Sequence, residues 1–318
     1  MFRVITAAVA ALFLASPSSA SPRLLVVSKE KRALQVLDAG TGQIQFEVAA
    51  PGEPHEVVAS PDGRFAYLAD FEGLKNVVSV VDLEEKAIVA SIDMAPIYKP
   101  HGLALTRDGT RLYVTCEGSK AVGEIDTAAR KVTRTFRLHE ELTHTLALSR
   151  DEKIVYAASS AGGNVAVINL DKGEFERSIL SGQGCEALAV SPGGSELWVV
   201  NRVAQTLAVI DAVAKKRVHI MACEGNPMRI SFTPDGKQVV VTCAIDGKLA
   251  LFDPVARTES GRVAVGQFPI VLVFDETGAN AYVTNSRGND VAVLDMAAGK
   301  VTKRFAVGGN PEGIAYLK

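Results

Sequence analysis

Three of the chain's five histidines recur at nearly constant spacing. His101 follows His55 by 46 residues, His144 follows after 43 more, and Glu186 comes 42 residues later. Imidazoles and carboxylates are ligands for Zn, Fe, Cu and Mn, and an open coordination position leaves room for chemistry. The spacing therefore predicts a metal or cofactor site built from His55, His101, His144 and Glu186, with a transition metal or a tetrapyrrole as the cofactor.

The same spacing continues beyond Glu186 to Met228, Ile270 and Glu312. These positions therefore share one structural level of a repeat. Neighbouring sheets pack about 10 Å apart, so the side chains must converge strongly to share one ion. Two other interpretations stay open: a duplicated histidine that only hydrogen-bonds a neighbouring loop, and direct contact with an organic ligand or a protein.

A strand pattern that ends in hydrophobic–Asp or hydrophobic–Asn occurs seven times, every 42 to 44 residues. Alternating apolar residues and Asp-Gly turns predict further strands between these runs. In the second unit the four expected strands are residues 102–106, 111–116, 121–126 and 131–138. A four-stranded antiparallel sheet repeated seven times predicts an all-β, seven-bladed propeller.

The two ends of the chain are out of phase with the repeat. Residues 313–318 supply only a first strand, and residues 23–28 resemble the second strand that should follow it. We therefore expect one blade to be closed by both termini, which hides two strand edges. Residues 21–318 are expected to form this single propeller domain.

Three of the repeated segments carry a recognisable motif: LYVTC at 112–116, LWVVN at 197–201 and AYVTN at 281–285. With the strands that follow them, they resemble the repeats of YVTN-family β-propellers over essentially the whole chain after residue 20. Relatives of that family include bacterial surface and periplasmic proteins of unknown role and proteins encoded beside quinoprotein alcohol-oxidation systems. The cytochrome d1 domain and the lactonases look similar at a greater distance. The resemblance implies the fold, while an activity has to be argued from the site.

A second set of equivalent positions ends the second strand of each blade, at the same end as the histidines. Two loops at that end, residues 71–76 and 94–99, are longer than in the other units. Insertions on one face of a repeat protein often mark its binding face, although tolerated loop drift is the alternative. The residues expected on this ligand or partner face are Asp70, Phe71, Lys75, Tyr98, Cys116, Met228, Cys243 and Glu312.

The four cysteines indicate no metal or redox motif, because the sequence has no CxxC pair. Cys116 and Cys243 stand three blades apart, too far for a disulfide. A bond between Cys185 and Cys223 stays open, although isolated buried cysteines are the expectation. The sequence also lacks the GxSxG, P-loop and HExxH patterns.

The first twenty residues have the composition of a secretory leader. Residues 1–3 give a positive start, residues 4–15 are apolar or small, and Ser18 and Ala20 suit a cleavage site after Ala20. The run is too short to span a bilayer, which takes about 20 residues. We expect a signal peptide over 1–20 and a periplasmic or secreted protein; a buried N-terminal helix is the alternative.

Together these features predict an exported propeller that acts as a monomeric binding or accessory protein through its histidine-rich face. Its expected partner is a small molecule or a periplasmic protein. A net charge of −2 gives no reason to expect binding to nucleic acid. One alternative is a metal- or tetrapyrrole-dependent enzyme or cofactor-maturation factor. Another is a lactonase-like hydrolase whose divalent ion would use Asp70, Asn201 and Glu312. Whether the protein is an enzyme stays open.

Overall fold

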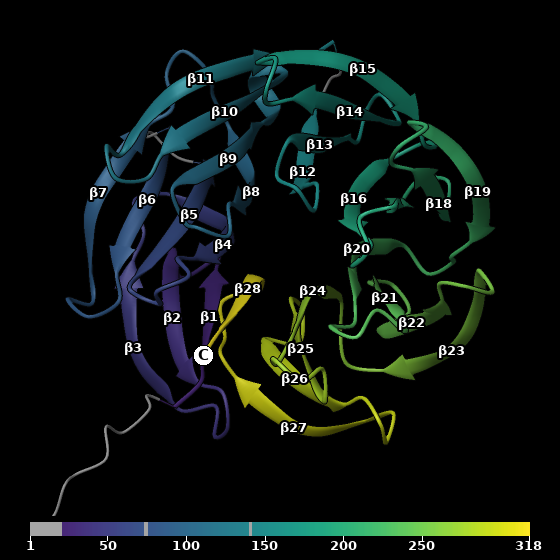
Figure 1. Cartoon of the computed structure of the whole chain (residues 1–318). Coiled ribbons are helices and arrows are strands. Elements are labelled where there is room, and N and C mark those ends of the chain that lie inside the picture. The colour runs from purple at the N-terminus through teal and green to yellow at the C-terminus, as the bar shows by residue number, and fades with distance from the viewer. Residues whose placement is uncertain (1–20, 73–75, 140–141) are drawn as a thin grey trace, which may run out of the picture.

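The computed structural model describes residues 21–72, 76–139 and 142–318, and it contains seven four-stranded antiparallel sheets arranged as blades around a central axis (Figure 1). Six blades follow one another along the chain. The seventh combines the last strand with the first three, in the order β28-β1-β2-β3. The predicted all-β seven-bladed propeller is confirmed, and so is its closure by both termini. The predicted signal peptide lies outside the described residues.

The inner strands, which line the axis, are β4 (Glu53–Ala59), β8 (Pro100–Leu105), β12 (Thr143–Leu148), β16 (Cys185–Val190), β20 (Pro227–Phe232), β24 (Pro269–Phe274) and β28 (Pro311–Leu317). The second strands are β5 (Phe65–Glu72), β9 (Arg111–Cys116), β13 (Ile154–Ser159), β17 (Glu196–Asn201), β21 (Val239–Cys243), β25 (Asn280–Asn285) and β1 (Arg23–Ser28).

The third strands are β6 (Val77–Asp82), β10 (Ala121–Asp126), β14 (Asn164–Asn169), β18 (Thr206–Asp211), β22 (Lys248–Asp253), β26 (Asp290–Asp295) and β2 (Ala33–Asp38). The outer strands are β7 (Ala87–Asp93), β11 (Lys131–Arg137), β15 (Glu174–Leu180), β19 (Lys216–Ala222), β23 (Thr258–Ala264), β27 (Lys300–Ala306) and β3 (Ile44–Ala49). A short 3-10 turn, η1 (Glu117–Ser119), follows β9.

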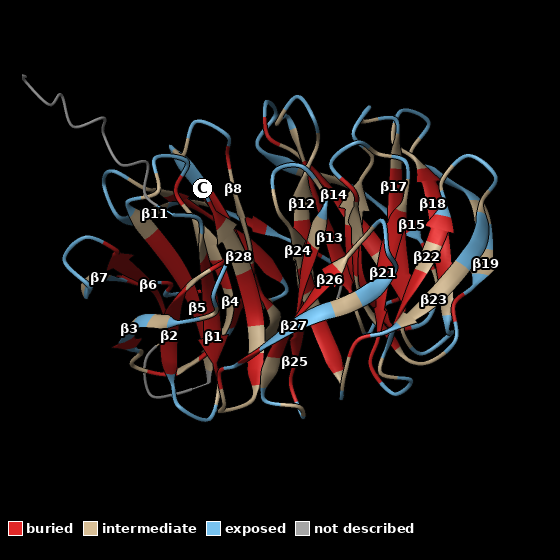
Figure 2. Cartoon of the chain, turned by 90° about the horizontal axis from the view of Figure 1, so that it is seen from below, coloured by how far each residue is buried: buried red, intermediate tan, exposed pale blue. Residues whose placement is uncertain are grey.

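The second and third strands form the core between blades, whereas the outer strands carry mostly exposed and partly buried residues (Figure 2). The Asp, or in β14 the Asn, that ends each third strand has a local role. In β2 the Asp38 carboxylate accepts hydrogen bonds from the backbone N–H groups of Gly40 and Thr41, which caps the turn into the next strand. The most regular residue of the repeat therefore serves the fold.

The threonine of the YVTN-like motif connects neighbouring blades. Thr115 Oγ1 accepts a hydrogen bond from Gly102 N (2.7 Å) and donates one to the backbone oxygen of His144 in the next blade (2.6 Å). Thr284 makes the matching bond to Glu312 O (2.7 Å). Each such bond fixes the start of the next inner strand, where the histidine level lies. We call this end of the propeller, marked by His55, His101 and His144, the histidine end.

All four cysteines are buried, and none of them forms a disulfide bond. Cys185 and Cys223 belong to different core clusters, so the bond that the sequence left open between them is not formed. The Cys223 thiol is hydrogen-bonded with the thiol of Cys243 in the neighbouring blade instead. Among the described residues, no helix has the length and apolar character needed to cross a membrane.

Candidate metal centre

Two inner strands approach each other closely at the histidine end because β8 carries a glycine there. A Cβ on Gly102 would lie only 2.7 Å from the backbone oxygen of His144 and 2.9 Å from Thr145 Cα. The glycine therefore allows β8 and β12 to converge, and the ring centroids of His101 and His144 are 4.0 Å apart. This meets the requirement that equivalent positions in neighbouring blades converge.

The three histidines form a continuous row of rings. The centroids of His55 and His101 are 5.1 Å apart, and Phe71 packs against both, at 4.7 Å and 5.3 Å. The structure therefore brings together the three histidines predicted as metal ligands and one residue of the predicted ligand face. Phe71, near the end of β5, packs over the rings.

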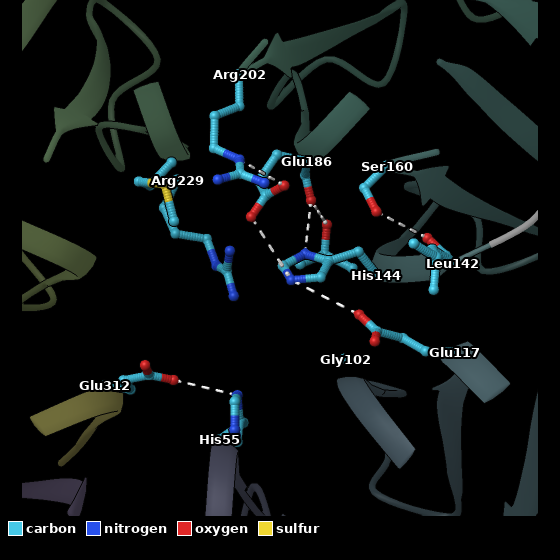
Figure 3. A network of polar contacts seen from close by, with 12 residues as sticks. His55, Gly102, Glu117, Leu142, His144, Ser160, Glu186, Arg202, Arg229 and Glu312 are labelled. Atoms are coloured by element: carbon cyan, nitrogen blue, oxygen red, sulfur yellow. Dashed lines mark hydrogen bonds and ion pairs between the residues drawn. The ribbon is translucent and has the colours of Figure 1, made fainter. Parts of the chain in front are cut away.

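His144 is held with one nitrogen facing two carboxylates (Figure 3). Its Nδ1 lies 3.0 Å from the backbone oxygen of Glu186, and because a carbonyl only accepts, Nδ1 carries the hydrogen. Nε2 then has the lone pair, and it lies 3.6 Å from Glu186 Oε1 and 3.9 Å from Glu117 Oε1. Three acceptors face one another, an arrangement that a cation would stabilise.

The tightest ligand cluster consists of His101, Glu117 and His144, whose ligand atoms all lie within 4.8 Å of one another. In a tetrahedral zinc site with bonds of about 2.1 Å, neighbouring ligand atoms are about 3.4 Å apart. Small side-chain movements are therefore enough to close the cluster around an ion. His101 Nδ1 is buried and has no hydrogen-bond partner among the described residues, as expected of a nitrogen kept for a ligand.

The protonation states suit metal binding. Burial, with help from the neighbouring charges, lowers the pKa of His101 well below its usual value and that of His55 to about 3, so both rings are neutral at pH 7. Burial also lowers the pKa of His144, although the Glu186 carboxylate opposes this shift. Burial and repulsion from Glu186 raise the pKa of Glu117 to about 7. A bound cation would relieve that repulsion.

Beside this cluster, His55 and an arginine complete the polar lining of the axis. His55 Nδ1 lies 3.2 Å from Glu312 Oε2, and Glu312 also pairs with Lys29 at 3.4 Å. Arg229 of β20 reaches across the axis and forms an ion pair with Glu56 of β4. Arg229 Nη1 and His55 Nε2 are buried, and within the part of the chain that the structure describes they have no hydrogen-bond partners.

The sequence analysis did not identify Glu117, Arg202 and Lys29. Each of them directly follows the last residue of the second strand of its blade. Arg202 Nε binds Glu186 Oε2 at 3.2 Å, as Lys29 binds Glu312 and Glu117 faces His144. The signal was present, because charged residues or Phe71 occupy this next position in four units. Moving the second set forward by one residue would have found all of them.

The longer loop at residues 94–99 supports Glu117. The backbone N–H of Glu117 donates to Lys99 O at 3.0 Å, and Tyr98 N donates to Ser119 Oγ at 2.8 Å. The Tyr98 ring, half exposed, lies over Gly118, where a Cβ would come within 2.2 Å of it. The added loop length thus holds the η1 turn that carries the carboxylate.

The other residues predicted on the ligand or partner face lie elsewhere. Cys116 and Cys243 are fully buried in the packing between blades, and Asp70 is buried and accepts a hydrogen bond from Ser79 at 2.6 Å. Met228 is partly buried and accepts a weak hydrogen bond from Asn226 at 3.6 Å. Glu312 faces the axis, as described above. Lys75 lies outside the described residues.

Two solved structures share this architecture. A functionally unknown protein from Desulfotomaculum acetoxidans DSM 771 matches with a TM-score of 0.80 and 13% identity, over 93% of this chain and 98% of that one. Hydrazine synthase from Kuenenia stuttgartiensis matches with a TM-score of 0.73 and 20% identity, over 83% and 89%. At these identities the likeness shows the fold alone. No curated protein sequence matches the chain.

The family model described as YNCE-like beta-propeller matches residues 24–277, which is most of the chain. The match agrees with the YVTN-like motifs and with the seven blades. The chain belongs to the YNCE-like beta-propeller family.

Proposed function

We propose that this propeller is a binding protein that holds one divalent transition-metal ion at its histidine end. His101 and His144 each supply an imidazole nitrogen, and Glu117 supplies a carboxylate oxygen. The observation that carries the proposal is the orientation of His144, whose lone-pair nitrogen faces two carboxylates while its N–H is used elsewhere. That arrangement is typical of a ligating histidine whose second nitrogen binds a carbonyl.

Glu186 acts on the ion through His144. Its backbone oxygen fixes the tautomer of His144, and its carboxylate is held by Arg202 at 3.2 Å, within reach of the same imidazole. His55 stands next in the row of rings, and its Nδ1 is held by Glu312. Of the four ligands that the sequence predicts, His101 and His144 bind directly, while Glu186 and His55 support them from the surrounding shell.

Two imidazoles and one carboxylate are a donor set that suits Zn²⁺ or Fe²⁺ and leaves at least one coordination position open. The proposal of a binding protein does not depend on chemistry at that position. The lactonase-like alternative has less support. Asn201 is buried and accepts a hydrogen bond from Ser181 at 2.7 Å, and Glu312 is already paired with Lys29 and His55. Of the three residues, only Asp70 keeps a buried oxygen, Oδ1, without a partner among the described residues.

We further propose that the protein works outside the cytoplasm, since residues 1–20 have the pattern of a cleaved leader. The mass of the protein purified from its native host tests this. Loss of the first 20 residues supports the proposal, and retention of Met1 contradicts it.

Metal binding is tested by titrating Zn²⁺, Fe²⁺ and Co²⁺ into chelator-treated protein and measuring stoichiometry and affinity by calorimetry. We expect one ion per chain and a loss of affinity of about 100-fold or more in His101→Ala and His144→Ala. His219→Ala is the matched control, because His219 lies on the outer strand β19. Binding that is absent, or that survives both substitutions, would refute the proposal.

A further inference from the structure

The histidine end contains a buried arginine with an unused hydrogen-bond donor. Arg229 is largely buried, and its Nη2 is paired with Glu56. Its Nη1 is shielded from solvent and has no partner in the described structure. Leaving a donor of a charged group unsatisfied is costly, so such atoms usually point to a partner that is not part of the chain.

The Arg229 side chain is directed toward the proposed metal centre. The Arg229 side chain projects from β20 into the centre of the ring, between Glu312 and His144 (Figure 3). Its charge lowers the pKa of His55, His101 and His144, so it lies within electrostatic reach of all three rings. A ligand in the open position of the metal would thus be near the guanidinium.

The charges around the axis favour an anion once the metal is bound. Four carboxylates and four cationic side chains surround the site in the described structure. They are Glu56, Glu117, Glu186 and Glu312, and Lys29, Lys99, Arg202 and Arg229. A divalent ion therefore leaves two positive charges without a counterion, in a buried place where unpaired charge is unfavourable.

We infer that the metal-loaded site binds a small carboxylate anion, with one oxygen on the metal and the other accepting a hydrogen bond from Arg229 Nη1. This inference rests on the proposed metal centre and names the ligand class of that site. A carboxylate fits because its two oxygens match a metal ion on one side and a guanidinium N–H on the other. Arg229 already binds one carboxylate in this way, because its Nη2 donates to Glu56.

The test uses Co²⁺-loaded protein, because the visible bands of Co²⁺ report on its coordination. Sodium acetate is titrated against sodium chloride of equal ionic strength. We expect saturable changes in the bands with acetate, and an acetate affinity at least about tenfold weaker in Arg229→Gln. The Co²⁺ affinity of that variant should stay within a few-fold of the wild type. Arg257→Gln is the matched control, because Arg257 forms a 2.6 Å ion pair with Glu196 away from the histidine end.

Removing Arg229 leaves Glu56 buried without its partner, so the double variant Glu56→Gln/Arg229→Gln is measured as well. It should fold and bind Co²⁺ while also losing acetate affinity. If wild-type protein binds Co²⁺ but acetate leaves the bands unchanged, or if both variants bind acetate like the wild type, the carboxylate inference is wrong and the metal centre stands. If Co²⁺ does not bind at all, the proposed function fails and the inference falls with it.

Discussion

The metal centre has a counterpart three blades further along the chain, where the equivalent backbone positions carry different side chains. Met228, Ala244 and Ile270 occupy the positions that correspond to His101, Glu117 and His144. The backbone at both places is held in the same way, since Thr242 Oγ1 donates to Ile270 O at 2.8 Å as Thr115 donates to His144 O at 2.6 Å.

One further position separates the two regions. Gly102 on the metal side corresponds to Arg229 on the counterpart side, and their backbone N–H groups bind the equivalent threonines. The glycine leaves room for two rings to meet, while the arginine projects into the axis toward them. The blades therefore provide equivalent backbone positions, and the metal centre arises where the residues at a few of these positions differ from those in the other blades.

The largest expected effect comes from giving the metal side the residues of its counterpart. His101→Met combined with His144→Ile should abolish metal binding in calorimetry. The metal-free variant should unfold at higher denaturant concentration than the wild type, because the substitutions remove a buried ring nitrogen without a partner. A gain of about 1–3 kcal/mol in the free energy of unfolding is expected.

The wild-type protein with saturating metal is the reference for this exchange, since only it should gain stability from the ion. A double variant that still binds the metal, or that unfolds more easily than the metal-free wild type, would show that the two regions differ in more than ligand chemistry.

The second prediction concerns pH and Glu117, for which the counterpart has Ala244. The pKa of Glu117 is raised to about 7, so protons compete with the metal for this carboxylate below pH 7. Burial lowers the pKa values of His101 and His144, so these rings become protonated at lower pH than a free imidazole does. Metal affinity should therefore fall about tenfold from pH 8 to pH 6.

Glu117→Gln tests the assignment of that pH dependence. The variant should bind metal about 10 to 100 times more weakly at pH 8 and lose most of the dependence between pH 8 and pH 6. An unchanged pH profile in the variant would assign the titration to another group.

The sequence was sufficient to predict that the site lies where the inner strands of the blades begin. The repeat places His55, His101 and His144 at the start of inner strands, and strands β9 and β10 have the predicted bounds. β8 begins two residues before the prediction, because Pro100 pairs with Cys116 across a register shift. Periodicity reports such positions well, since every blade repeats the same backbone.

Periodicity marks the position of Glu117 but not where its carboxylate lies, and it assigns no role to Arg229, for two physical reasons. Glu117 is placed by a turn that depends on contacts with the loop at residues 94–99, which is longer than its equivalents in the other units. Arg229 has a long side chain that crosses the axis and pairs with Glu56 in a blade that is not adjacent to its own. Both depend on tertiary contacts specific to one place in the ring.

The smallest expected effect separates backbone packing from ligand chemistry, using two glycines in equivalent environments. A Cβ on Gly102 would lie 2.7 Å from His144 O, and one on Gly313 would lie 2.6 Å from His55 O. Alanine at either position must push two inner strands apart, so both variants should lose about 1–3 kcal/mol in the free energy of unfolding.

Only Gly102→Ala moves the strands that carry His101 and His144, so only this variant should also bind metal more weakly, by a few-fold. Gly313→Ala separates β28 from β4, and neither strand carries a proposed ligand. Urea unfolding and metal calorimetry on both variants give the two readouts. Equal losses of metal affinity would mean that the whole ring, and not the approach of β8 to β12, sets the geometry of the centre.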